Sequence, residues 1–313
     1  MFCVISLVVL SILGIFSASN RQLAKEALDC VLRRVTFRPC TTGFDEKKKA
    51  KILGVVIIRS EGAARFLNRY FEALSWTFFI LMVVSTIWTV RGFYLFYVTG
   101  NCNGLNDAVF CVFDPTGENN QVSNQGGPGC AVSDNPIRDL TLKNVDISTW
   151  PVMNETSPDK VVMVGCYACD YTRKVYPELR ELVTRYNISF TFADFPVKEK
   201  TDYLSRIGYC VYRADREKFW PLNDALFAAA KPDLENTAFV DGVLSNLGLD
   251  AAKIEACAND PATSEAVTEQ LHQIKNTNFP GTPTVFVNGE GVVGPKPARV
   301  YAIMLKGLFY WLK

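Results

Sequence analysis

The chain has 313 residues and a formal net charge of +1, from 33 basic and 32 acidic side chains. This length allows one or two domains, and the balanced charge excludes the extended basic surface typical of nucleic-acid-binding proteins. Ten cysteines are many for a protein held in a reducing compartment, so their positions decide how the chain is interpreted.

The first apolar stretch, at about residues 2–20, carries no charge. Its length fits a transmembrane helix. Ser17, Ala18 and Ser19 would also suit the cleavage site of a signal peptide, although no basic residue precedes the apolar run. We expect an uncleaved span, and a cleaved signal peptide is the alternative.

A second apolar stretch, residues 74–98, predicts a transmembrane helix more strongly. Its one charged residue, Arg91, lies toward the far end among aromatic side chains of the kind found at membrane interfaces. The sequence therefore predicts a membrane region at residues 1–98 that contains two spans.

The loops beside these stretches differ in charge. Residues 21–73 contain twelve Lys or Arg side chains, whereas residues 92–137 contain none. The positive-inside rule places the basic loop in the cytoplasm and the chain beyond residue 98 outside. Within that loop, residues 52–74 fit either an amphipathic helix on the inner leaflet or an ordinary solvated helix hairpin. We expect a multi-pass protein of the cell membrane with an extracytoplasmic C-terminal domain.

Residues 99–139 are rich in Gly, Asn, Asp, Pro and Ser, a composition typical of a flexible linker or an irregular external loop. The linker carries Cys102, Cys111 and Cys130. A disulfide between Cys102 and Cys111 is the simplest arrangement, but spacing alone does not settle the pairing, and the partner of Cys130 stays open.

The most informative motif follows a short apolar run at residues 161–164, which predicts a buried strand. Gly165 ends this run, and Cys166-Tyr167-Ala168-Cys169 opens a segment of helical spacing. At a strand-to-helix junction the first thiol is expected near the helix N-terminus, where unpaired N–H groups favour a thiolate. Cys166 is the predicted nucleophile.

Cys169 is the predicted resolving thiol, one turn further along and more buried. From this position it can attack a mixed disulfide formed at Cys166. A structural disulfide is one alternative for the pair. Half of a zinc site is another, although no second close pair of Cys or His ligands follows at suitable spacing.

The remaining pattern from residue 140 to 313 predicts a single α/β domain. A second strand at residues 187–194 completes a strand–helix–strand unit with parallel strands. Helical spacing then fills an insertion at about residues 198–277, with Pro261 as a breaker. A strand hairpin and a last helix follow. The predicted helices cover residues 201–213, 216–230, 237–247, 250–258, 263–275 and 298–313.

Four landmarks in this domain resemble the DsbA-type branch of the thioredoxin superfamily. They are the cysteine motif after a buried strand, Phe195-Pro196 after the second strand, Lys218-Phe219-Trp220 with Asp224-Ala225-Leu226-Phe227, and Gly281-Thr282-Pro283-Thr284 before the last hairpin. The resemblance covers residues 140–313 and implies a thioredoxin-like core interrupted by a helical insertion. The membrane region lies outside it.

The resemblance also implies roles for particular residues. Thr282-Pro283 would be a cis peptide that faces the cysteine pair and, with Tyr167 and Ala168, contacts the substrate chain; a trans turn is the alternative. Cys210 and Cys257 would form a structural disulfide in the insertion, with a pair of buried thiols as the other possibility. Phe219 and Trp220 are expected to be core, and His272 a surface residue.

The predicted activity is thiol–disulfide exchange on protein thiols and disulfides, without a metal or organic cofactor. Reoxidation implies a membrane partner of the quinone-reductase type. Tyr167-Ala168 stands where strongly oxidising relatives have Pro-His, so we expect a less oxidising centre. Alternatives are a reductase or isomerase supplied with electrons through the membrane, or a receptor or scaffold with an inert disulfide.

Overall fold

The computed structural model describes residues 18–35, 50, 54, 58, 61–107, 109–122, 140–197 and 201–312. The chain divides into two compact units, Met1–Arg91 and Gly92–Lys313. The cysteine motif and all the strands of the described chain belong to the second unit.

The membrane prediction concerns helix α4, Glu61–Thr99. Its part Trp76–Thr99 is the one helix in the described chain that is long and apolar enough to cross a membrane. Of the basic stretch at residues 52–74, the part from residue 61 onward is continuous with this helix, and most of the residues before it lie outside the described chain. The first predicted span, residues 2–20, lies outside the described residues except for positions 18–20, which begin helix α2, Ala18–Val35. Two spans are therefore not confirmed.

The second unit is built around a five-stranded sheet with the order β1-β3-β2-β4-β5. Strands β2 and β3 run parallel, and the other neighbouring pairs are antiparallel. This is the thioredoxin-like core that the sequence predicts. Strand β1 was not predicted, because it is too short to show a periodic pattern. The strands are Val152–Met153 (β1), Lys160–Gly165 (β2), Ser189–Asp194 (β3), Thr284–Val287 (β4) and Glu290–Val293 (β5).

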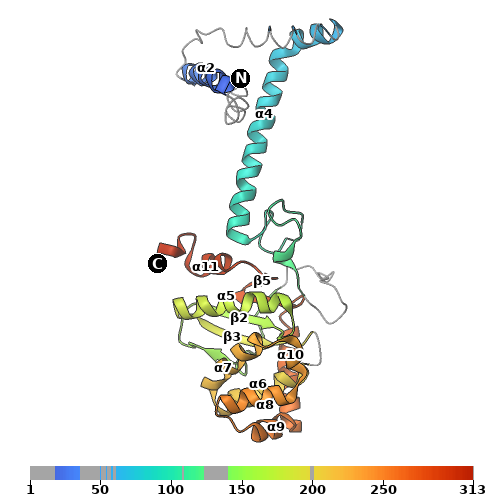
Figure 1. The fold of residues 1–313 in the computed structure, drawn as a ribbon, viewed down its shortest axis with the longest axis vertical. Coiled ribbons are helices and arrows are strands. Elements are labelled where there is room, and N and C mark those ends of the chain that lie inside the picture. Colours follow the sequence, from blue (N-terminus) through green and yellow to red (C-terminus); the bar gives the residue numbers. More distant parts are fainter. Residues whose placement is uncertain are drawn as a thin grey trace. The chain divides into compact units, whose positions relative to one another are not determined.

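The sheet has an apolar cluster on each face, because successive side chains of a strand point to opposite sides. Val161 and Met163 of β2 belong to the larger cluster, which includes helices α5 and α11, while Val162 and Val164 belong to a smaller cluster with Trp150. Figure 1 shows α5 and α11 side by side against the sheet. The helices of this unit are α5 (Asp170–Tyr186), α6 (Asp202–Ala214), α7 (Arg216–Ala228), α8 (Thr237–Asn246), α9 (Ala251–Ala258), α10 (Pro261–Lys275) and α11 (Ala298–Lys306).

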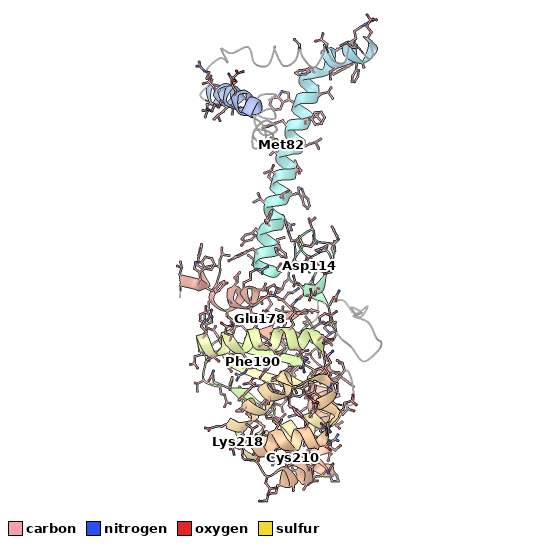
Figure 2. All side chains as sticks on the ribbon, in the orientation of Figure 1. Met82, Asp114, Glu178, Phe190, Cys210 and Lys218 are labelled. Carbon is pink, nitrogen blue, oxygen red and sulfur yellow. A yellow bond between two sulfur atoms is a disulfide. The ribbon has the colours of Figure 1, made fainter. Side chains whose placement is uncertain are left out.

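Helices α6 to α10 form the predicted insertion between β3 and β4. Phe219 and Trp220 of α7 are buried in its apolar core, as expected. A disulfide joins Cys210 of α6 to Cys257 of α9 with a Cα–Cα distance of 6.0 Å, the pairing that the family resemblance implies. Figure 2 labels Cys210 among these helices. The insertion is thus closed by a covalent link between its first and fourth helices.

Two predicted helix boundaries are wrong. Helix α10 starts at Pro261 and not at residue 263 as predicted, because proline is tolerated at the first helical position and Asp260 caps the next N–H group. Helix α11 ends at Lys306 and does not continue to residue 313. Gly307 stops it by adopting a φ of 87°, a conformation that favours glycine.

The segment immediately after α4 packs on the domain, so its described part is an irregular loop and not a flexible linker, the two possibilities that the composition left open. We call residues 100–107 and 109–122 the stapled segment, since a disulfide joins Cys102 to Cys111. The side chain of Asn106 pairs with the free edge of strand β5: its amide donates to the Gly291 carbonyl at 2.8 Å and its oxygen accepts from the Val293 N–H at 2.9 Å. One side chain thus supplies both hydrogen bonds of a neighbouring strand.

The end of the stapled segment runs along the first turns of α5. Glu118 pairs with Lys174 at 2.6 Å, and Gln121 accepts a hydrogen bond from Tyr171. Lys296, which is only 1% exposed, donates to the Asn120 side chain. Burial lowers the pKa of Lys296 to about 7, against the attraction of Asp114 and Asp107. The segment is therefore part of the folded domain.

A substitution at Gly294 tests the packing of the stapled segment against the domain. It has a φ of 81°, and a Cβ added there would lie 2.7 Å from backbone atoms of Asn120. We expect Gly294→Ala to lower the free energy of unfolding by roughly 2–4 kcal/mol, from backbone strain and the clash together. The matched control is Gly289→Ala, which has a φ of 91° but open space around the added Cβ. Urea unfolding of both variants checks this, and equal losses would contradict close packing of Asn120.

Candidate active site

The turn Cys166–Cys169 connects β2 to α5. The Cys169 N–H donates to the Cys166 carbonyl at 3.1 Å, and the helix begins at Asp170 with Cys169 as its N-cap residue. The first thiol, predicted at the helix N-terminus, lies three residues before the N-cap position. The second cysteine occupies that position because the intervening residues form a tight turn.

The whole motif is enclosed. Cys166, Ala168 and Cys169 are 0% exposed and Tyr167 is 1% exposed, and both cysteines are present as thiols. Cys169 is buried as predicted, but it is no more buried than Cys166. The enclosure of Cys166 does not favour immediate access by a protein substrate.

The loop before β4 lies against the second cysteine. Cys169 Sγ donates to the Thr282 carbonyl at 3.4 Å, although the two residues are 113 positions apart in sequence. The Thr282–Pro283 peptide bond is cis, and the buried hydroxyl of Thr282 has no hydrogen-bond partner in the described structure. The fold therefore brings together the two segments that the sequence singled out.

Tyr167 points into the domain and does not present its side chain to solvent, unlike the substrate-contacting residue that the resemblance implies. Its hydroxyl donates to Asn223 of α7 at 2.6 Å, and its ring contacts those of Phe192 and Phe227. Burial raises the pKa of Tyr167 well above its ordinary value, so the phenol stays neutral. Tyr167 thus fixes the turn to the helical insertion.

Arg173 makes a second connection between the turn and the insertion. Its guanidinium donates to the Tyr167 carbonyl at 3.1 Å and to the Leu226 carbonyl at 3.5 Å, and it also binds the Ala229 carbonyl. Neither Arg173 nor Asn223 was predicted from the sequence as a site residue. No sequence pattern marks these two residues, because their contacts with residues more than 50 positions away form only when the chain folds.

The charge of Asp170 is compensated in the structure. Its carboxylate pairs with Lys231 at 2.5 Å. From the sequence, the negative charge beside Cys169 was expected to disfavour a thiolate. The nearby cation weakens that effect, so the expectation of a less oxidising centre rests mainly on the absence of a histidine donor between the cysteines.

Asp194, also missed from sequence, lies at the end of β3 beside the turn. It pairs with Gly165 in the sheet register, and Ser205 donates to its carboxylate at 2.6 Å. Burial raises the pKa of Asp194 from 3.8 to about 7, although the hydrogen bonds from Ser205 and the Tyr167 backbone lower it. The group therefore titrates near neutral pH.

This shift predicts a pH-dependent stability. Between the unfolded pKa of 3.8 and the folded value of about 7, only the folded chain keeps the proton. The associated stability is therefore fully present at low pH and is lost as pH rises through 7, by on the order of 4 kcal/mol. In urea unfolding at pH 4, 6 and 8, Asp194→Asn should show a smaller decline than the parent chain.

The control for this prediction is Glu265→Gln, which removes an exposed carboxylate from α10. It should leave the decline unchanged. If Asp194→Asn declines as steeply as the parent chain, Asp194 does not carry the shift.

The other predicted site residues do not belong to the Cys166–Cys169 turn. Cys102 and Cys111 form the disulfide of the stapled segment, Cys210 and Cys257 that of the insertion, and Cys130 lies outside the described residues. His272 is exposed on α10. In the part of the chain that the structure describes, no three His, Cys, Asp or Glu side chains gather as metal ligands would.

This chain is similar to a known protein family and to two bacterial proteins. Residues 152–304 match the family described as thioredoxin. The probable disulfide bond formation protein D of Bacillus cereus is 25% identical over 146 residues, which cover 43% of this chain and 68% of that protein. Its counterpart in Bacillus anthracis is 24% identical over 147 residues, covering 43% and 67%.

A third relative and two solved structures complete the comparison. An Na⁺/H⁺ antiporter NhaA 1 of Salinispora arenicola is 27% identical over 135 residues, covering 42% of this chain but only 20% of that protein. The thiol-disulfide exchange protein alpha-DsbA2 of Wolbachia pipientis has a TM-score of 0.44 and 18% identity, covering 51% of this chain and 87% of its own. Oxidised BdbD of Bacillus subtilis has a TM-score of 0.43 and 18% identity, covering 58% and 93%.

The sheet order and the helical insertion agree with the match to the thioredoxin family over residues 152–304. The second unit has a thioredoxin-like α/β fold.

Proposed function

We propose that this protein is a membrane-anchored enzyme that exchanges disulfides with protein thiols outside the cytoplasm, and that Cys166 and Cys169 are its redox centre. The observation that carries the proposal is the contact between Cys169 Sγ and the Thr282 carbonyl, beside the cis Thr282–Pro283 bond. The backbone of the loop before β4 could pair with an extended substrate chain, and this loop lies beside the dithiol.

In the proposed reaction, a substrate thiolate attacks Cys166 Sγ of the oxidised pair. A bond forms between the substrate sulfur and Cys166 while the Cys166–Cys169 bond breaks, and Cys169 leaves as a thiolate. A second substrate thiolate then attacks the first substrate sulfur, which closes the substrate disulfide and releases Cys166. The substrate loses two electrons, and its two thiol protons are balanced by those that the cysteine pair gains.

The proposed location rests on charge and on disulfides. Helix α4 supplies the anchor through Trp76–Thr99. The chain that follows it lacks Lys and Arg through residue 137, as outer segments do. The second unit also contains two disulfides besides the active pair, which is typical of an oxidising compartment.

Continued oxidation of substrates requires an electron acceptor that regenerates the Cys166–Cys169 disulfide. A membrane partner of the quinone-reductase type would meet this need beside the anchor. If the partner instead delivers electrons, the same centre works as a reductase or isomerase. The reduction potential of the pair, set against that of its compartment, distinguishes these directions.

The enclosure of Cys166 favours one further candidate, a thioredoxin-fold receptor or scaffold without exchange activity. Its thiol is 0% exposed, and a thiol that never reaches solvent cannot be attacked. On our proposal, the groups that cover Cys166 move aside during exchange, so the two candidates differ in the reactivity of this thiol.

The test uses the full chain in detergent or in vesicles. The protein is equilibrated with glutathione buffers, and Cys166 and Cys169 are then trapped by alkylation and identified by mass spectrometry. We expect reversible conversion between dithiol and disulfide, at a potential lower than that of strongly oxidising relatives. If the pair neither exchanges nor reacts with the alkylating agent, the enzyme proposal fails and the non-catalytic scaffold is the remaining candidate.

A further inference from the structure

The exposed apolar side chains of the second unit gather in three segments. In its described part, every large apolar side chain that is exposed belongs to the last turns of α4, to the loop around the Cys102–Cys111 disulfide, or to residues 307–312. From residue 114 to residue 306, the described chain exposes none, although this part contains the sheet and helices α5 to α11. Soluble surfaces usually scatter such side chains, so their concentration indicates that a partner covers them.

We use one name for the most exposed of these side chains outside α4. Their exposed fractions run from 53% to 76%. The apolar rim consists of Val109, Phe110, Val112, Phe309, Trp311 and Leu312.

The last turns of α4, which belong to the second unit, are fixed to the domain. Arg299 of α11 donates to the carbonyls of Phe96 and Tyr97 at 3.3 and 3.2 Å. These are among the carbonyls that the end of a helix leaves without a partner in the helix. The side chain of Asn119, in the stapled segment, donates to the Gly100 carbonyl at 2.9 Å. Because α11 and the stapled segment both bind the helix end, the apolar rim keeps its position beside these turns.

The loop of the stapled segment packs back along α4. The ring centroid of Phe113 lies 4.2 Å from that of Phe93 and 5.4 Å from that of Phe96. Phe93 precedes Thr99, the last residue of α4, by six positions, so the loop reaches back by about 9 Å along the helix. The apolar part Trp76–Thr99 has 24 residues and is about 36 Å long, against roughly 30 Å for the hydrocarbon core of a bilayer. When this part crosses a membrane, the loop therefore lies at the boundary of the core.

Residues 307–312 lie at the same end of the second unit. They follow α11, which holds the end of α4 through Arg299, and Figure 1 shows them beside α11 and level with the last turns of α4. The ring of Trp311 contacts those of Phe309 and Tyr310. Neither residues 108–113 nor residues 307–312 contain a charged side chain. Uncharged segments with Trp and Tyr are typical of the interface between a membrane and water.

We propose that the apolar rim inserts into the outer leaflet of the membrane that α4 crosses, at the level of the lipid headgroups and the first acyl carbons. This inference rests on the membrane anchor of the proposed function. Continuity with α4 favours lipid over a protein partner, because Phe113 joins the loop to the part of the helix that lipid surrounds. The domain then rests on the bilayer and is not held away from it by a flexible tether.

Docking of the apolar rim also fixes the height of the cysteine turn above the bilayer. The stapled segment continues from the rim to α5, where Gln121 accepts a hydrogen bond from Tyr171, two residues after Cys169. Glu118 of the same segment pairs with Lys174 of α5. A substrate chain or a redox partner therefore meets the cysteine pair at one distance from the membrane surface.

The experiment places a photo-crosslinking residue, p-benzoylphenylalanine, at single positions of the full chain in phosphatidylcholine vesicles. Position 110, in place of Phe110, reports on the rim, and position 88, in place of Trp88, reports on the anchor. Position 253, in place of the exposed Lys253, is the control, because its helix α9 lies at the opposite end of the second unit in Figure 1. After irradiation, mass spectrometry identifies the molecule joined to each position. We expect lipid adducts at positions 88 and 110, at least about tenfold more abundant than at position 253.

A charge variant tests the contribution of the loop. With the crosslinker in place of Trp311, Phe110→Glu combined with Val112→Glu should lower the yield of lipid adducts about tenfold, because carboxylates oppose burial in the interface. The matched control combines Ala252→Glu with Ala256→Glu, which adds the same two charges at exposed positions of α9. This control should leave the yield unchanged.

The outcomes separate the docking from the anchor. Lipid adducts at position 88 but not at position 110 overturn the docking and leave the anchor in place. An absence of lipid adducts at position 88 overturns the anchor and the docking with it. Crosslinks from position 110 to a second copy of the chain, in place of lipid, assign the rim to self-association and overturn the proposal. An equal yield at position 311 in both charge variants removes the loop from the docking surface.

Discussion

Replacing Cys166 with serine is expected to abolish the oxidation of a dithiol peptide, with a loss of at least about a thousandfold in turnover. The reaction requires a disulfide at this position, and a hydroxyl cannot form one. Turnover is measured with a model dithiol peptide and a chemical oxidant that regenerates the pair, so that no membrane partner is needed.

Cys169→Ser is the matched control, because it removes the other thiol of the same turn. Without a resolving thiol, Cys166 should attack a disulfide peptide and stop at the mixed disulfide, visible by non-reducing mass spectrometry as one peptide per chain. Accumulation at Cys169 in the Cys166→Ser variant would reverse the assignment of the two roles. Turnover in both variants would remove the pair from the reaction.

The second large effect concerns the disulfide of the insertion. Cys210 and Cys257 are 47 residues apart, so the link strongly restricts the unfolded chain. Replacing both with alanine should lower the free energy of unfolding by about 4 kcal/mol on the chain-entropy scale. Urea unfolding of the two chains, followed by circular dichroism, measures the difference.

The disulfide of the stapled segment provides the comparison within the same chain. Cys102 and Cys111 are only 9 residues apart, and on the same scale their removal should cost about 2.6 kcal/mol. Their replacement should also release Asn106 from strand β5, with little effect on the insertion. A larger loss from the short link than from the long one would contradict the unfolded-chain explanation.

Much of the fold follows from local patterns. The apolar run before Cys166 predicts β2, and the alternation at residues 187–194 predicts β3. Helical spacing locates the insertion because each of its helices buries one apolar face. The boundaries were less accurate at Pro261 and Gly307, where the decisive factors are a helix start and a left-handed backbone conformation.

The enclosure of the motif and its polar contacts could not be read from the pattern. Asn223 and Arg173 touch the turn from segments whose sequence carries no sign of the contact. Asp194 is an ordinary acidic residue at the end of a strand until burial raises its pKa to about 7. The stapled segment has the composition of a linker, yet Asn106 and Asn120 bind it to the domain.

By itself the sequence determined the order of strands β2 to β5 and of the helices between them, the apolar stretch at residues 74–98 and the position of the cysteine pair, because these depend on residue type and spacing. Only the tertiary structure decided which distant groups meet: Cys169 with Thr282, Tyr167 with Asn223, and Asn106 with strand β5. The reason is physical. Burial and hydrogen bonding depend on where the chain returns in space, and no local pattern records that.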